Sequence, residues 1–391
     1  MDHILKCHEI IKEDFVRGDN CYLYDISGNK YIDLEAGIWC TVLGYNHPRI
    51  NKTIKEQLDK VIHLNYRYTN FLAEEASAVL LNTLSLPDGR CIFLSSGSEA
   101  VEFAVQVAKI VTGKSLFLTL SDSYLSAYGA AGTKSPNTCI CFDWHQCRNC
   151  KHTNVCDNCA RFSDISFNDI GTFVFEPGSS SGAVRFPPQK LINTIVKKTK
   201  DNNGLLIIDE VTTGLGRTGK WYGFEYYGLA PDVITIGKGL GNGYPVSAVA
   251  MKNNIADHLE KSNFHYIQSH QNDPLGCSIA LEVIRVIKQE ALIERSASLG
   301  EYFIAQLHQI KEQHKIIKEI RGRGLMIGIE FTGNHDKFST KSVYQRMLDR
   351  RFLVGYSQNL RMIAFHPALT IEKQIIEDFV EQLDNVLKEL V

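Results

Sequence analysis

Apolar residues recur with two different periods along the chain, and the change of period divides it into regions. Near the N-terminus, CYLYD and KYIDLEAGIW are alternately or continuously apolar around a turn at residues 27–29, which predicts a short β-meander. From about residue 50 to about 250, short apolar runs alternate with segments of helical period. This order predicts a mostly parallel sheet with helices on its faces.

The last third of the chain, from Pro274, has mainly helical periodicity. Within it, RGRGLMIGIEF predicts a strand that the chain enters through glycines. We therefore expect an α/β fold in which residues 49–274 form a large domain, while residues 1–48 and 275–391 together form a smaller α+β domain. The final segment, IEKQIIEDFVEQLDNVLKEL, has an apolar face made of Ile375, Phe379, Leu383, Leu387 and Leu390.

Composition narrows the function classes. The 391 residues are 44% apolar, enough for a large and a small core, and 42 basic residues nearly balance 44 acidic ones. This balance gives no electrostatic reason to expect nucleic acid or a membrane as a partner. The start, MDHILKCHEI, lacks the pattern of a secretory signal. We therefore expect a cytoplasmic protein whose eleven cysteines are thiols or metal ligands.

Two apolar strands in the middle of the chain end in reactive side chains. GLLIIDEV (204–211) leads into Asp209, and PDVITIGKG ends at Lys238. Because ligands bind beyond the carboxyl ends of parallel strands, we expect both side chains to face one crevice. A carboxylate can keep a pyridinium nitrogen protonated, and a lysine amine can form an imine with a cofactor aldehyde. The pair indicates pyridoxal 5'-phosphate (PLP), although an aspartate alone in this position also serves to cap or brace a turn.

The segment SSGSEA (95–100) opens a predicted helix and has the character of a phosphate site. Ser98 is the expected N-cap, and Gly97 frees the backbone for close approach. Unpaired amide groups of the first turn and the hydroxyls of Ser96 and Ser98 suit a phosphate dianion. An ordinary capped helix has the same pattern.

An acidic pair after an apolar strand is also typical of the magnesium-binding strand of P-loop nucleotide triphosphatases. The nearest match to a phosphate loop ends in Gly113-Lys114-Ser115 and has Ala108 in place of the first glycine. It follows a predicted helix, EAVEFAVQVAKIVTGK, and precedes a predicted strand, SLFLTL. This order is the reverse of what a phosphate loop requires, so the sequence disfavours that class.

These stretches resemble the class III, fold type I family of PLP-dependent aminotransferases over nearly the whole chain. The resemblance rests on SSGSEAVEFAVQVAKIVTGK, on GLLIIDEVTTGLGRTGKWYGFEYYGLAPDVITIGKGLGNGYPVSAVA, on CYLYDISGNKYIDLEAGIWCTVLGYNHPRI and on IRGRGLMIGIEF. It implies that Lys238 carries the internal aldimine, that Asp209 pairs with the ring nitrogen and that Val211 packs on the ring. Gly97 and Ser98 would hold the phosphate.

The resemblance also implies a homodimer with shared active sites, because SHQNDPLGC is similar to the segment that crosses the family's dimer interface. Ser269 would complete the partner's phosphate site there, so the dimer would be obligate. The sequence departs from the family in SDSYLSAYG, which keeps only Tyr124 for stacking on the ring. Thr212 replaces a common glutamine, and Glu176 lies in a wall, FVFEPGSSSG, that is rich in serine.

The implied reaction is transamination between an amino acid or amine donor and an oxo acceptor. Lys238, once displaced by the donor, would remove the α proton while Asp209 keeps the ring protonated. The same parts would serve an aminomutase or a racemase if the proton returned elsewhere.

Substrate-binding residues are indicated by resemblance as well. NLRMIAFHPALTI is similar to a late segment that often presents an arginine to a substrate carboxylate, and Arg361 is its only arginine. Trp39, and Tyr66 or Tyr68, fall in stretches that line the family's substrate pocket. GIWCTVLGYNHP is particularly similar to the diaminopelargonic acid synthase type.

The segment CICFDWHQCRNCKHTNVCDNC (139–159) predicts a metal site within an insertion. Cys147 and Cys150 form one CxxC pair, and Cys156 and Cys159 form another. Two such pairs can present four thiolates to one tetrahedral ion, which favours structural zinc over an iron–sulfur cluster or reduced thiols. Alone, this segment would suggest a zinc-ribbon binding module.

Overall fold

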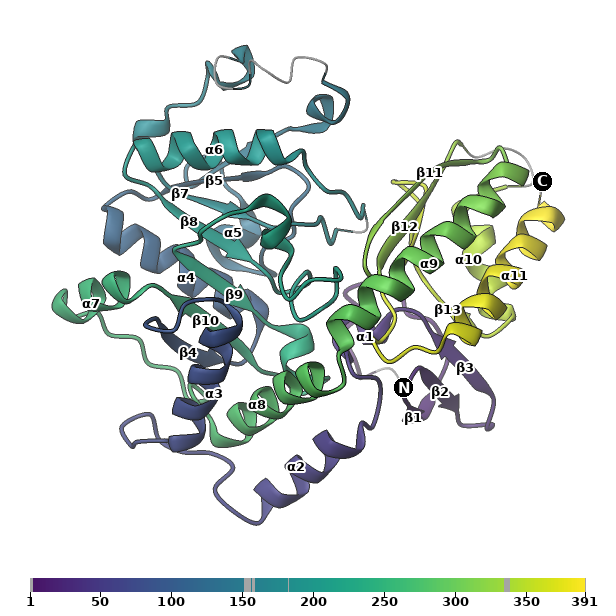
Figure 1. Ribbon diagram of the computed structural model, residues 1–391, viewed down its shortest axis with the longest axis horizontal. Coiled ribbons are helices and arrows are strands. Elements are labelled where there is room, and N and C mark those ends of the chain that lie inside the picture. Colours follow the sequence, from purple (N-terminus) through teal and green to yellow (C-terminus); the bar gives the residue numbers. More distant parts are fainter. Residues whose placement is uncertain (1–2, 151–155, 157–158, 182, 334–337, 391) are drawn as a thin grey trace.

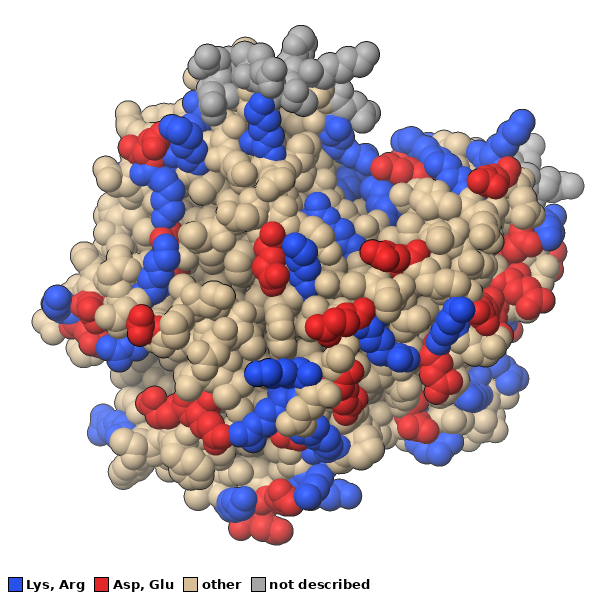
Figure 2. Space-filling view, in the orientation of Figure 1, with Lys and Arg blue, Asp and Glu red and all other residues tan. Residues whose placement is uncertain are grey.

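The computed structural model describes residues 3–150, 156, 159–181, 183–333 and 338–390, arranged as a large and a small lobe. Figure 1 shows the large lobe built around one sheet and the small lobe formed by both ends of the chain. Basic and acidic side chains are interspersed over the face in Figure 2. Within the described part of the chain, no helix has both the length and the apolar character needed to cross a bilayer.

A seven-stranded sheet forms the centre of the large lobe, in the order β4-β10-β9-β8-β7-β5-β6. β10 is antiparallel to both of its neighbours, whereas β9, β8, β7, β5 and β6 pair in parallel. The strands are β4 (Arg90–Leu94), β5 (Leu116–Leu120), β6 (Cys139–Phe142), β7 (Ile170–Phe175), β8 (Leu205–Asp209), β9 (Val233–Ile236) and β10 (Ser247–Met251).

Helices cover both faces of this sheet, which is why its strands are apolar without alternation. On one face, α4 (Gly97–Thr112) packs across β7 to β10 and is joined by α5 (Gly129–Thr133) and α7 (Asn253–Lys261). On the other face lie α3 (Phe71–Thr83) and α6 (Gln189–Asp201), with α2 (Pro48–Leu58) and α8 (Pro274–Gln289) packed outside. Successive residues of β8 alternate accordingly: Ile207 joins the core beneath α4, and Ile208 joins the opposite core.

The small lobe joins the two chain ends through strand pairing. The N-terminal meander of β1 (Phe15–Asp19), β2 (Tyr22–Asp25) and β3 (Lys30–Asp33) takes β13 (Phe352–Leu353) as a parallel partner of β3. A second, antiparallel sheet contains β11 (Ile317–Arg323), β12 (Met326–Phe331), β15 (Met362–Phe365) and β14 (Gly355–Ser357). The helices of this lobe are α9 (Leu292–Gln313), α10 (Thr340–Asp349) and α11 (Lys373–Leu390), whose predicted apolar face is buried.

The strand predicted for RGRGLMIGIEF is β12, and the glycine-containing segment before it forms a hairpin with β11 that the sequence did not predict. Gly324 adopts a left-handed conformation, with φ of 52°, between β11 and β12. A residue with a side chain is strained in this conformation, so glycine lets the chain reverse.

The passage between the lobes lies close to the C-terminal end of α8. α8 packs on α2 and α3 of the large lobe, whereas α9 packs on β11 and α11 of the small lobe. We therefore propose that the large domain extends through α8, to about Glu290, beyond the boundary at residue 274 that the sequence suggests.

Candidate active site

Asp209 is the last residue of β8 and is buried at the carboxyl edge of the sheet. Its Oδ1 accepts hydrogen bonds from the Val211 amide at 3.0 Å and from the Thr235 hydroxyl, on the neighbouring strand, at 3.2 Å. Burial raises the pKa of Asp209 to about 6, against the opposing effects of the Val211 amide and the Lys238 charge. The carboxylate is therefore fixed in one orientation and sensitive to a nearby cation.

Glu210 braces the turn that follows the strand. Its carboxylate accepts hydrogen bonds from the Thr213 hydroxyl at 2.6 Å and from the Gly223 and Phe224 amides at 2.9 and 2.8 Å. Burial raises its pKa to about 8. Glu210 thus braces the turn together with Asp209, whose Oδ1 holds the Val211 amide.

Lys238 follows β9 and opens the short 3₁₀ helix η6 (Lys238–Gly241). Its φ of 42° lies in the left-handed region, which costs a residue with a side chain roughly 1–2 kcal/mol. The charge of Lys238 acts on Asp209, Cys40 and His366, so these four side chains share one neighbourhood. The structure therefore brings the lysine and the aspartate together, and the strain is of the kind that functional sites retain.

The predicted phosphate turn opens α4, but the N-cap differs from the prediction. Ser96, not Ser98, is the cap, because its hydroxyl accepts the Glu99 amide at 3.2 Å. The Ser98 hydroxyl accepts the Ala127 amide at 2.9 Å and so anchors a neighbouring loop. A Cβ atom added to Gly97 would lie 2.6 Å from Cγ1 of Val211. The helix N-terminus is therefore packed against the residue that follows Asp209 and Glu210.

Glu176 joins two of the predicted ring-contacting residues. It is buried just after β7 and accepts hydrogen bonds from the Tyr124 amide at 3.1 Å, the Ser180 amide at 3.1 Å and the Thr212 hydroxyl at 3.3 Å. Burial, and then the charge of Asp209, raise its pKa to about 8. Glu176 holds the loops that carry Tyr124 and Thr212, while the Tyr124 ring stays half exposed.

His366 is a site residue that the sequence reasoning missed. Its ring stacks on Trp39 with centroids 3.7 Å apart, and its Nδ1 donates a hydrogen bond to the Glu35 carbonyl at 2.5 Å. Burial and the charge of Arg217 hold its pKa well below the usual value, so the imidazole is neutral. A signal existed, since His366 is a polar residue inside the apolar segment MIAFHPAL.

Arg361, predicted to bind a substrate carboxylate, lies away from this group. Arg361 is exposed at the start of β15, where its Nη1 donates to the Thr332 carbonyl at 3.2 Å. His366 follows the opposite end of the same strand, so β15 separates Arg361 from Lys238. Tyr66 and Ser269 lie on exposed loops.

The four predicted metal-binding cysteines line a single cavity of about 410 Å³. Cys150 is exposed, and Cys147, Cys156 and Cys159 are partly buried. Burial raises the pKa of the Cys147 thiol; the charge of Arg161 opposes this, and the other three cysteines add to it. The structure thus brings both CxxC pairs to one place.

Comparison with known proteins identifies the family. The model of the class-III aminotransferases matches residues 7–130 and 140–387. This chain belongs to the class-III aminotransferases. Its chemistry is PLP-dependent transamination, the transfer of an amino group to an oxo acceptor.

Relatives of this class-III aminotransferase span nearly its full length. It is 31% identical to an acetylornithine aminotransferase of Methanothermobacter thermautotrophicus, over 95% of this chain and 93% of that protein. It is 29% identical to a leucine/methionine racemase of Thermococcus litoralis, over 96% and 90%. The fold matches an S-selective transaminase from Arthrobacter sp. (TM-score 0.88, 24% identity, 98% and 94% covered) and a Bacillus anthracis aminotransferase (0.90, 23%, 99% and 96%).

Proposed function

We propose that PLP binds between the N-terminus of α4 and the ends of β8 and β9, with Lys238 as its covalent anchor. The cradle fits the cofactor, because amides of the first turn of α4 suit a phosphate and Gly97 leaves no side chain in the way. Asp209 would face the ring nitrogen, Val211 one face of the ring and Tyr124 the other. When bound, PLP supplies the electron sink for negative charge that develops on the donor.

Each residue has a distinct task in this proposal. Lys238 Nζ takes the α proton of the donor and would return it to a carbon of the cofactor. Asp209, fixed by Val211 and Thr235, stabilises a protonated ring nitrogen, and that cation in turn lowers the pKa of the carboxyl. Glu176 positions Tyr124 and Thr212 and stays out of proton transfer.

The observation that carries the proposal is that Asp209 pairs with Thr235 of β9, three residues before Lys238, at one edge of the sheet. Borohydride reduction should fix the cofactor on the peptide that contains Lys238, as mass spectrometry would detect. We expect K238A to lose this adduct and at least about 10²–10⁴-fold in kcat, the usual contribution of a general base. The control K261A, an exposed lysine of the same domain, should keep both. An adduct at another lysine would contradict the assignment.

For the substrate, we propose an amino acid donor, with N-acetylornithine first in the screen because several relatives are named for it. The relative named as a racemase favours a second candidate function, racemisation of leucine or methionine, in which the proton returns to the α carbon that lost it. Two assays separate them: formation of an oxo product and loss of optical rotation without one. Arg361 should not contribute to carboxylate binding, and R361A should leave the donor KM unchanged.

We propose that the working unit is a homodimer in which Ser269 completes the partner's phosphate site. Several large apolar side chains between residues 58 and 71 are exposed, and monomers rarely leave such patches uncovered. Tyr66 lies in this segment, so dimerisation would also position a substrate-facing residue. S269A should weaken PLP binding without changing the dimer, measured by cofactor titration and sedimentation.

We further propose that Cys147, Cys150, Cys156 and Cys159 bind one structural zinc ion. Arg161 and Lys190 line the same cavity, and their charges would offset the negative charge of a tetrathiolate site. Between the first two cysteines, Arg148 pairs with Glu319 of β11 at 2.6 and 2.8 Å, so the ion would steady a contact between the lobes.

Metal analysis of protein purified without chelator tests the zinc site. We expect one zinc per chain, lost in C147S and kept in C141S, a cysteine of the neighbouring strand. Iron and sulfide in place of zinc would show that the four cysteines hold an iron–sulfur cluster. Absence of both metals would show that the cysteines are reduced thiols.

A further inference from the structure

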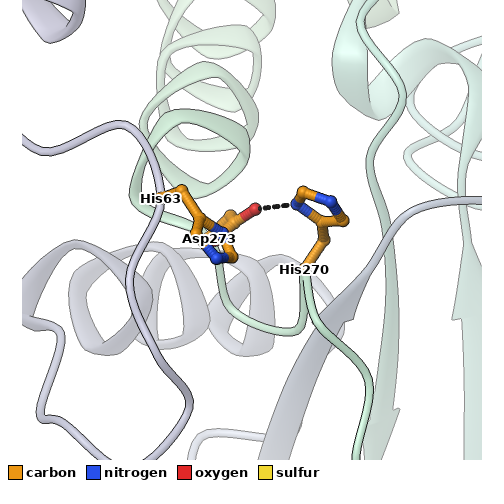
Figure 3. A group of neighbouring side chains, drawn as sticks. All are labelled: His63, His270 and Asp273. Carbon is orange, nitrogen blue, oxygen red and sulfur yellow. Dashed lines mark hydrogen bonds and ion pairs between the residues drawn. The ribbon is translucent and has the colours of Figure 1, made fainter.

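Three side chains from two distant segments meet on the surface of the large lobe (Figure 3). His63 lies in the connection between α2 and α3, and His270 and Asp273 lie in the segment that leads into α8. His63 Nδ1 is 2.7 Å from one oxygen of Asp273, and His270 Nδ1 is 2.6 Å from the other. The two imidazole rings are 5.0 Å apart and tilted by 55°, so they approach the carboxylate from different directions.

Asp273 occupies an N-cap position but does not act as an N-cap. It directly precedes α8, whose first residue is Pro274, yet its side chain accepts no hydrogen bond from the first turn. An aspartate in this position ordinarily accepts one from an amide two or three residues on. Here the carboxylate turns to the two histidines and to the Leu64 amide at 3.3 Å. The arrangement is therefore organised around the imidazoles.

We propose that His63, His270 and Asp273 form a binding site for a divalent transition-metal ion such as zinc. One ligand atom from each residue lies within 4.8 Å of the others. Tetrahedral zinc with bonds of about 2.0–2.1 Å needs ligand atoms about 3.4 Å apart, so the contacts of 2.7 and 2.6 Å would lengthen when an ion enters between the three groups. Two imidazoles and one carboxylate favour zinc, cobalt or nickel over magnesium or calcium. A fourth position stays open for water.

Exposure in the single chain and anchoring by a buried carboxylate both characterise the site. The side chains of His63 and His270 are 50% and 62% exposed in one chain, whereas the side chain of Asp273 is only 10% exposed. His270 and Asp273 also line a cavity of about 230 Å³ that reaches Ser95, beside the phosphate turn.

The site joins two loops that the proposed function uses, and this consequence rests on that function. His63 precedes Tyr66 by three residues, and His270 directly follows Ser269, which we propose to contact the partner's cofactor. An ion would hold the two loops together. Asn70 already links them, because its side-chain amide donates to the Asn272 carbonyl at 2.6 Å.

Zinc titration of the holoenzyme, followed by calorimetry and thermal unfolding, tests the site. We expect wild type to take up one more zinc per chain than the cysteines account for, and to gain Tm because the ion binds the folded state. H63A and H270A should weaken this uptake by more than about 100-fold, exceeding the loss of an outer-sphere partner. H265A, an exposed histidine of the same loop, should bind as wild type does.

D273N provides a second variant that retains the shape of the carboxylate. It should also lose the additional zinc while its cofactor absorbance stays normal, which shows that the fold is intact. Equal uptake by wild type, H63A and H270A would place the ion elsewhere and overturn the site. No additional uptake by wild type would overturn it as well. Cofactor attachment at Lys238 is scored separately, so failure of the metal site leaves the proposed function untouched.

Discussion

Two adjacent acids, Asp209 and Glu210, have opposite environments because successive residues at a strand end point to opposite sides. Asp209 faces the neighbourhood of Lys238, and Glu210 faces the turn and accepts three hydrogen bonds there. The sequence predicted that Asp209 lies at the edge of the sheet. It did not predict that Glu210 accepts the three hydrogen bonds that brace the following turn.

Gly97 offers a test of the phosphate turn at the scale of one methyl group. G97A would place a Cβ 2.6 Å from Val211 and force the turn or the ring-packing residue to shift. We expect PLP affinity to fall at least about tenfold, because a strain of about 1.4 kcal/mol in the bound state lowers a binding constant by that factor. G113A, at the left-handed C-cap of the same helix, should cost stability and leave PLP affinity unchanged. Equal PLP titrations for G97A and wild type would contradict the proposed turn.

Buried acids predict how the stability of the apo-protein depends on pH. Burial is the main reason that the pKa is raised to about 6 in Asp209, about 7 in Glu35 and about 8 in Glu176 and Glu210. Between about pH 5 and pH 8 the folded state therefore holds protons that the unfolded state has released, and stability falls as pH rises. E176Q should reduce this fall in Tm, and E381Q, on an exposed residue, should not. A Tm that rises across this window would contradict the prediction.

At the scale of elements, apolar runs determined what the sequence could predict. β8 was predictable because four consecutive apolar residues end at Asp209, β9 because a short β-branched run ends just before Gly237 and Lys238, and α11 because its apolar face repeats at helical spacing. The hairpin at Gly324 was missed because β11 carries Arg321, a buried cation whose partners lie elsewhere in the chain. The group at Asp273 was not predictable, since His63 is 210 residues away.

Arg321 connects β11 to both β12 and the large lobe. Its guanidinium pairs with buried Glu330 at 2.7 Å and donates to the Ala183 and Val184 carbonyls at 2.9 and 3.2 Å. Burial alone would raise the pKa of Glu330, but hydrogen bonds from Lys318 and Arg321 lower it to about 2. Glu330 therefore adds stability above about pH 4, and this is lost as pH falls toward 2.

Removing that arginine should loosen the contact between the lobes. R321M leaves Glu330 with Lys318 and a longer contact to Arg185 at 3.9 Å, and leaves two carbonyls without their donor, so we expect a loss on the order of 3 kcal/mol in urea unfolding. R346M, which breaks a surface pair with Glu389, should cost less than about 1 kcal/mol. Similar losses of unfolding free energy in both variants would show that the buried pair stabilises the protein no more than the surface pair does.

At the scale of the whole molecule, we propose that one chain leaves the candidate site incomplete. Ser269 and Tyr66 lie on exposed loops of the single chain, although the resemblance assigns them to cofactor and substrate. Their loops are joined by the contact between His63 and Asp273, so both belong to one surface. The resemblance indicated only the part of this surface at SHQNDPLGC; the exposed side chains between residues 58 and 71 could not be predicted, because exposure depends on how the chain packs. A second copy of the chain is the occupant that would give both residues a role.

That surface can be tested by placing a charge at its most exposed ring. Phe71 is 77% exposed at the start of α3, in a segment that also exposes Val61 and Tyr68. F71E would bury a carboxylate in the proposed interface, so sedimentation should show a monomer with weakened PLP binding. V16E alters a residue 66% exposed on β1 of the small lobe and should remain a dimer with full cofactor. If F71E remained a dimer, the interface would lie elsewhere. If it became a monomer that bound PLP as tightly as wild type, Ser269 would have no role in the partner's site.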